Sequence, residues 1–144
     1  MEQKHYAAGV ALFRRAYRVA SNPEILYPLG DALAKAGLRA EAKSVLAKFE
    51  KAALTELEGD DNANRELVLY YLDHANRPKE ALRIAKLEAA RRRDLHTLEV
   101  YAAALRRNGN RSEAERVLAE SRERLSATSQ KSAASQNFAH KPAM

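Results

Sequence analysis

Four small residues recur along the chain at intervals that favour a repeat architecture. Gly9 and Ala42 lie 33 positions apart, Ala42 and Ala81 lie 39 apart, and Ala81 and Ala114 again lie 33 apart. A period of about 34 residues is typical of helix–turn–helix repeats, in which each unit buries its apolar face against the next. The longer middle interval indicates an insertion of about five residues relative to that period, which we place in 54–62.

The segments around these residues have the pattern of paired helices. Residues 26–49, 67–90 and 98–121 each contain apolar positions spaced three and four apart, then a turn, then a second such stretch. Glycine and asparagine tolerate the left-handed conformation that such turns require. The residues expected to turn the chain are Gly37, Asn76 and Gly109. In the insertion, we expect Gly59 to end one helix and Asp61 or Asn62 to cap the next.

These patterns predict an all-α solenoid of about seven helices over residues 1–125. The predicted segments are a lone helix, or half-repeat, at 4–21 and helical hairpins at 23–57, 62–92 and 95–125. The remaining residues, 126–144, are rich in Ser, Ala and Gln. They have too little apolar surface to offset the entropy of ordering, so we expect a flexible, disordered tail.

The chain resembles the tetratricopeptide repeat (TPR) family over residues 6–124. The resemblance rests on Leu29 and Gly30 with Gly37 and Ala42, and on the run Gly109-Asn110-Arg111-Ser112-Glu113-Ala114. Two departures are Leu69, where the family usually has a small residue, and Asn76, where it usually has glycine. The resemblance implies a TPR-like solenoid in which the first helix of each hairpin lines a concave groove. A peptide or helix of a partner protein would bind in that groove.

The groove implied by the resemblance takes residues from the first helix of each hairpin. They are Tyr27, Asp31 and Lys35; Glu66, Tyr70, Asp73 and His74; and Glu99, Arg106 and Arg107. We expect Tyr27 and Tyr70 to anchor the partner, because aromatic residues contribute much of the binding energy at interfaces. The same two rings are equally suited to filling the core between repeats. Arg106 and Arg107 suit a carboxylate of the partner, or a solvated position at a helix C-terminus.

The sequence contains no combination of residues with the spacing of a catalytic, cofactor-binding or metal-binding site. The chain has no cysteine, which excludes disulfides, thiol catalysis and Cys-ligated metals. His96 and Glu99 lie three apart, but a metal site needs further ligands. Asp60, Asp61 and Asn62 lack the spacing of a calcium loop. We therefore expect a non-catalytic protein–protein interaction scaffold without cofactor or metal.

The formal net charge of +6 is unevenly distributed. Residues 1–75 hold 10 basic and 11 acidic side chains, whereas residues 76–125 hold 13 basic and 8 acidic ones. The alternative hypothesis is therefore a nucleic-acid binder that uses the basic residues of the second half. Those residues are Arg83, Lys86, Arg91, Arg92, Arg93, Arg106, Arg107 and Arg111. We favour a protein partner, because repeats that read RNA need equivalent base-reading side chains in each repeat, and equivalent places here hold dissimilar residues (Lys35, His74 and Arg107).

The lone first helix has no partner from its own repeat. We therefore expect part of its apolar surface, formed by Tyr6, Val10, Phe13 and Tyr17, to lack a mate, whereas terminal repeats usually carry a polar capping face. Either the chain is the C-terminal segment of a longer array, or it forms a homo-oligomer through this helix. No run of about 18 apolar residues predicts a transmembrane segment. The compartment stays open: the lack of cysteine fits the cytoplasm, and the periplasm would require a longer precursor.

Overall fold

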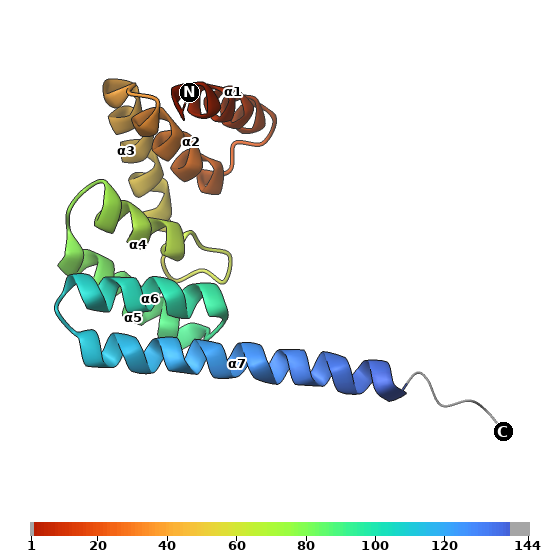
Figure 1. Ribbon diagram of the computed structural model, residues 1–144. Coiled ribbons are helices and arrows are strands. Elements are labelled where there is room, and N and C mark those ends of the chain that lie inside the picture. The colour runs from red at the N-terminus through yellow and green to blue at the C-terminus, as the bar shows by residue number, and fades with distance from the viewer. Residues whose placement is uncertain (1, 139–144) are drawn as a thin grey trace. The chain divides into compact units, whose positions relative to one another are not determined.

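The computed structural model describes residues 2–138, which form seven α-helices and no strand (Figure 1). The helices are α1 (Glu2–Val19), α2 (Pro23–Lys35), α3 (Arg39–Thr55), α4 (Asn64–Asp73), α5 (Pro78–Arg91), α6 (Leu95–Arg107) and α7 (Arg111–Phe138). The predicted all-helical fold is therefore confirmed. Among the described residues, no helix is both long enough and apolar enough to cross a bilayer.

The helices belong to two compact units. Unit 1 is Met1–Asn76 and contains α1 to α4, and unit 2 is Arg77–Met144 and contains α5 to α7. The boundary falls inside the hairpin predicted at 62–92, so α4 and α5 belong to different units. The stacking of successive hairpins into one solenoid therefore stays a prediction.

The three residues predicted to turn the chain have the left-handed backbone that the prediction required. Their φ angles are 83° at Gly37, 50° at Asn76 and 80° at Gly109. Two of the turns are built alike: the Leu38 N–H donates to the Leu33 carbonyl, and the Asn110 N–H donates to the Leu105 carbonyl, both at 2.9 Å. These bonds satisfy carbonyl groups that a helix end would otherwise leave unpaired.

In unit 1, α2 packs against α1 on one side and against α3 on the other. Helices α2 and α3 approach closely at Gly30, where an added Cβ would lie 2.5 Å from Cγ and Cδ2 of Leu46. Ala42, Leu46 and Phe49 of α3 are buried, so the α2–α3 hairpin has a continuous apolar seam. Glycine is required at Gly30 because the leucine occupies the space of a side chain.

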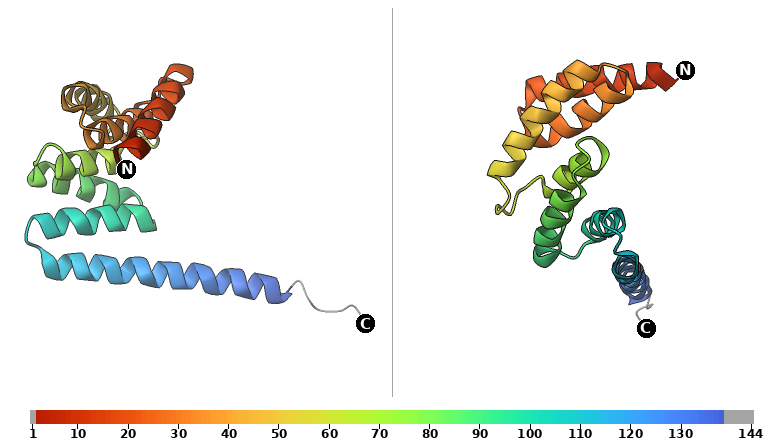
Figure 2. Two further views of the ribbon diagram at one scale, coloured as in Figure 1. Left: turned by 45° about the horizontal axis from the view of Figure 1, so that its top comes forward. Right: turned by 90° about the vertical axis from the view of Figure 1, so that its left-hand side faces the viewer.

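In unit 2, α6 packs against α5 and α7, and α7 runs on well past the other two helices (Figure 2). Ala81 of α5 and Ala114 of α7 are fully buried, as is Leu105 of α6. The predicted burial of Ala42, Ala81 and Ala114 is therefore confirmed. Gly9 differs, because a Cβ there would meet only Phe13 Cε2, at 4.0 Å.

The predicted uncovered surface of α1 is wrong in its location. Val10 is buried in a cluster with Leu29 and Leu33 of α2, and Phe13 packs against this cluster. Tyr6 and Tyr17, which share the helix face of Val10, are half-buried. The spacing of these four residues places them on the side that meets α2, so α2 covers much of the surface expected to be free. The exposed apolar residues of α1 are instead Leu12 and Val19.

The connection between α3 and α4 differs from the prediction at its first end. Helix α3 ends at Thr55, before Gly59, and the Thr55 hydroxyl donates to the Ala52 carbonyl at 2.7 Å. At the second end, Asn62 Oδ1 accepts the N–H of Asn64, the first residue of α4, at 3.0 Å. Asn62 therefore supports the helix start as predicted, although the N-cap position itself is occupied by Ala63.

The flexible tail predicted from residue 126 is a continuation of α7 as far as Phe138. The side chains of residues 122–135 are exposed, so burial does not stabilise this extension. Residues 126–138 contain Ala, Gln and Lys, which are good helix formers, and they continue a helix that is already nucleated by packing on α6. The remainder of the predicted tail, 139–144, lies outside the described residues.

The close contact at Gly30 generates a stability prediction. We expect Gly30→Ala to lower the free energy of unfolding by about 1–3 kcal/mol, because overpacking against Leu46 outweighs the roughly 1 kcal/mol that alanine gains over glycine within a helix. The matched control is Gly9→Ala, also within a helix but in open surroundings, which should raise stability by about 0.5–1 kcal/mol. Urea unfolding followed by circular dichroism measures both changes. Equal effects of the two substitutions would contradict the packing described here.

Candidate functional site

Five of the ten predicted groove residues meet in unit 1, where α2 contacts α4. Tyr27, Asp31 and Lys35 belong to α2, Tyr70 belongs to α4, and His74 is the C-cap residue directly after α4. Asp31 joins the two helices: its Oδ1 lies 3.0 Å from His74 Nε2, and its Oδ2 accepts from Lys35 Nζ at 2.6 Å. One carboxylate thus holds a lysine of its own helix and a histidine that lies 43 positions further along the chain.

The aromatic rings of this surface are fixed from below by Phe49 of α3. The Tyr27 ring lies 5.5 Å from the Phe49 ring and meets the His74 ring edge-on at 6.2 Å. The Tyr70 ring lies 6.2 Å from Phe49 and stacks with His74 at 6.5 Å. Phe49 is fully buried, whereas Tyr27, Tyr70 and His74 are half-buried. The two tyrosines therefore fill the core on one side and reach solvent on the other. This position is compatible with both roles considered from the sequence, filling the core and contacting a partner.

Glu50 is a member of this surface that the sequence analysis missed. Its Oε2 accepts a hydrogen bond from the Tyr70 hydroxyl at 3.3 Å, and its Oε1 accepts one from the Tyr71 hydroxyl at 3.0 Å. The only signal in the sequence is its position directly after Phe49, the end of the apolar pattern in that hairpin. Glu50 fixes the orientation of the Tyr70 ring, so this ring does not have to be ordered when a partner binds.

Negative charge gathers around Tyr27. Burial raises the pKa of the Tyr27 hydroxyl, and the neighbouring carboxylates of Asp31, Asp73 and Glu66 raise it further. The hydrogen bond to Asp31 in turn raises the pKa of the Lys35 ammonium group. We call the seven residues of unit 1 the α2–α4 face: Tyr27, Asp31, Lys35, Glu66, Tyr70, Asp73 and His74. Three carboxylates and one lysine make this face acidic when His74 is neutral.

The other three predicted groove residues belong to α6 in unit 2. Glu99, Arg106 and Arg107 are all exposed. Glu99 Oε2 lies 3.7 Å from His96 Nδ1, so the pair seen in the sequence is an exposed ion pair when the histidine is protonated. Arg106 and Arg107 occupy the last turn of α6, where the helix dipole stabilises a positive charge. One groove containing all ten residues stays a prediction, because the residues belong to separate units.

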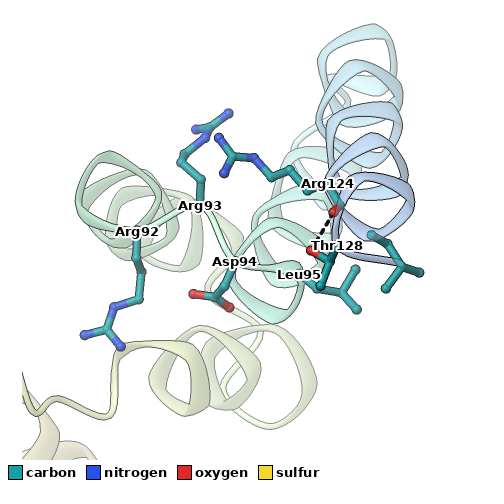
Figure 3. Close-up of a pocket in the computed structure, with 7 residues that line it drawn as sticks. Arg92, Arg93, Asp94, Leu95, Arg124 and Thr128 are labelled. Carbon is teal, nitrogen blue, oxygen red and sulfur yellow. Dashed lines mark hydrogen bonds between the residues drawn. The ribbon is translucent and has the colours of Figure 1, made fainter. Parts of the chain in front are cut away.

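A hollow of about 500 Å³ in unit 2 was not predicted from the sequence (Figure 3). It is lined by Arg92, Arg93 and Asp94 of the α5–α6 connection, by Leu95 at the start of α6, and by Arg124, Leu125 and Thr128 of α7. The side chains of Arg93 and Arg124 approach each other, whereas Arg92 points away from both. The hollow includes part of the α7 extension that we had expected to be flexible, which is why the sequence analysis had no reason to place a site there.

Carboxylates already neutralise several arginines of unit 2. Arg93 binds Glu120 with two nitrogens, and its Nε lies 3.0 Å from Glu120 Oε1, which also accepts from Arg124 Nε at 3.2 Å. These contacts hold the pKa of the Glu120 carboxyl below its usual value, and the hydrogen bond from Arg93 is the largest cause. Arg92 Nε lies 2.6 Å from the buried Glu88 carboxylate. The hollow is therefore not a free anion site, and the basic residues of the nucleic-acid hypothesis include side chains held in ion pairs.

Among the described side chains, no group of three or more His, Asp or Glu residues is arranged to hold a metal ion. The contacts of the histidines and carboxylates described above are ion pairs and helix-to-helix bonds. No protein-family model, curated protein or solved structure matches the chain.

The shared carboxylate of Glu120 generates a pH-dependent prediction. Because its pKa is lowered in the folded chain, the ion pairs contribute stability above the ordinary glutamate pKa of 4.5 and lose it as the pH falls through the folded value. We expect Glu120→Gln to lower the urea midpoint at pH 7, and the difference from wild type to shrink steadily below about pH 4.5. The control is Glu123→Gln on the same helix, which makes neither of these two ion pairs. A difference that is independent of pH would contradict the assignment.

Proposed function

We propose that this chain is a non-catalytic scaffold of the TPR type that binds a peptide or helix of a partner protein on the α2–α4 face. The observation that carries the proposal is the meeting of Tyr27, Tyr70 and His74 on one half-exposed surface, with Asp31 bridging the two helices. Half-exposed aromatic residues with a polar edge are the residue types that contribute most at interfaces.

The order of this surface supports a binding role over a purely structural one. Phe49 and Glu50 hold the tyrosine rings in place, so few side chains would lose freedom when a partner binds. Filling the core would not by itself require carboxylates around Tyr27, yet Asp31, Glu66 and Asp73 all lie near enough to raise its pKa. Their charge favours a partner segment that presents lysine or arginine, which interacts both with the carboxylates and with the faces of the rings.

Charge reversal at the edge of the face tests this function. We expect Glu66→Lys combined with Asp73→Lys to weaken capture of the partner at least tenfold, because each new lysine repels a basic segment of the partner. Tyr70→Ala is less suitable, since it also removes the contacts with Phe49 and Glu50. The immobilised full chain captures partners from an extract of the cells that produce it, and the eluted proteins are identified and quantified.

The matched control is Glu115→Lys combined with Glu123→Lys, two exposed residues of α7 whose substitution changes the net charge equally. The control should retain the partner, and circular dichroism should show equal helicity for both variants. Equal capture by both variants would refute the α2–α4 face as the binding site.

Nucleic-acid binding is the alternative function, and the ion pairs of unit 2 weigh against it. Arg83 pairs with Glu80, Arg92 with Glu88, and Arg93 with Glu120, so these arginines would have to leave a carboxylate to bind phosphate. Such an exchange reduces the gain from each phosphate contact.

We therefore expect no saturable binding of a single-stranded RNA oligonucleotide at 150 mM salt, measured by fluorescence anisotropy. Any binding at 20 mM salt should fall steeply as salt is added, as a sequence-independent electrostatic contact does. Micromolar or tighter binding that persists at 150 mM salt would favour the alternative over the scaffold.

A further inference from the structure

A second hollow, of about 390 Å³, lies in unit 1 between α1 and the turn from α2 to α3. It is lined by Lys4, Ala7, Val10, Arg14, Ala36 and Leu38. Four of these six residues are apolar, and Leu38 is 47% exposed although it is a large aliphatic residue. The volume lies within the usual range for ligand-binding clefts. The hollow belongs to neither the α2–α4 face nor the arginine-lined hollow of unit 2.

The rim of this hollow is basic. Lys4, Arg14 and Arg18 lie on the same face of α1 as Ala7, because their positions are separated by multiples of a helical turn. Arg14 pairs with Glu41, which leaves two exposed charges on this face of α1: Lys4, which lines the hollow, and Arg18, one helical turn beyond Arg14. A symmetric contact of α1 with α1 of another copy would bring these like charges together, so the charge pattern disfavours it.

The chain itself contains a segment with the complementary chemistry. Residues 54–61, LTELEGDD, carry four carboxylates and no basic side chain. Leu54, at the end of α3, is 40% exposed. Glu56 and Asp61, two and seven positions further along the chain, are also exposed. We call 54–61 the acidic segment. The acidic segment combines an exposed leucine with negative charge. The hollow between α1 and the α2–α3 turn, which we call the α1 hollow, combines an apolar floor with positive charge.

We propose that the acidic segment of one copy docks into the α1 hollow of a second copy. Leu54 contributes the apolar side chain for the floor at Ala7 and Leu38, and the carboxylates of Glu56 and Asp61 face Lys4 and Arg18. The two surfaces are different parts of unit 1, so the contact is head-to-tail and repeats from copy to copy, without closing as a symmetric dimer does. A contact confined to one hollow and one short segment is weak, and its electrostatic part is screened by salt.

Complementary charge reversal tests this contact with the full chain. One variant carries Lys4→Glu and Arg18→Glu in the hollow, and the other carries Glu56→Lys and Asp61→Lys in the acidic segment. Arg14 is left unchanged, because it holds Glu41. Sedimentation equilibrium over a concentration series at 50 mM salt measures the association constant of each protein and of the equimolar mixture.

Wild type should gain mass with concentration and lose this association at 500 mM salt, and each variant alone should associate at least tenfold more weakly. The mixture should regain association, because the acidic hollow of the first variant attracts the basic segment of the second. The unchanged acidic segment of the first variant also attracts the unchanged basic hollow of the second. Leu54→Asn, which leaves the charge unchanged, should also weaken association by a smaller factor. The matched controls are Arg122→Glu with Lys131→Glu, and Glu115→Lys with Glu123→Lys, all at exposed positions of α7; both should associate as wild type does.

A monomeric wild type at every concentration would overturn the proposal, as would association that both reversed variants retain. Weakened association that the mixture fails to restore would also overturn it, because the two surfaces would then not contact each other. Circular dichroism and thermal unfolding check that each variant is folded. The α2–α4 face is unchanged in all of these proteins, so partner capture on it is measured independently.

Discussion

The close approach of helices at small residues is the constraint on which both units depend. Gly30 leaves the space that Leu46 occupies, and a single added carbon would lie 2.5 Å from that leucine. Ala42, Ala81 and Ala114 are buried in the same way at their helix contacts. Small residues bring two helix backbones close enough for the neighbouring leucines and aromatic residues to interdigitate at the density of a protein interior. With larger residues the helices would separate, and the seams beside these positions would lose contacts.

The α2–α4 face follows from this packing. Because α3 is held close to α2, Phe49 lies beneath the rings of Tyr27 and Tyr70. Residues of α2 and α4 then meet above it, and Asp31 contacts both Lys35 and His74. The surface is thus ordered from the core outward, with apolar contacts below and charged groups at the edge. Such an arrangement supports the proposed role in recognition, because the rings and charges are already fixed in place by their neighbours.

Charge has different roles in the two units. In unit 2, carboxylates pair with the arginines at the α5–α6 connection and on α7, so a basic composition does not translate into an equally free basic surface. In unit 1, basic residues gather on α1 and acidic ones in 54–61, although the totals nearly cancel. Net charge by itself therefore misleads in both units, because binding depends on which charges are neutralised and on which side of the fold the others lie.

The spacing of small and apolar residues by itself determined the all-helical class and the turns at Gly37, Asn76 and Gly109, because these depend on local backbone preferences and on one apolar face per helix. The family resemblance assigned ten residues to one groove, and five of them, Tyr27, Asp31, Lys35, Tyr70 and His74, meet in unit 1. Only the tertiary structure decided that Asp31 bridges Lys35 and His74, that Glu50 orients Tyr70, and that α2 covers Val10 and Phe13. The continuation of α7 past residue 125 also went beyond the sequence analysis, because composition argues against burial but does not prevent a nucleated helix from continuing in solvent. Contacts between distant segments depend on which helix faces meet, and a one-dimensional pattern does not contain that information.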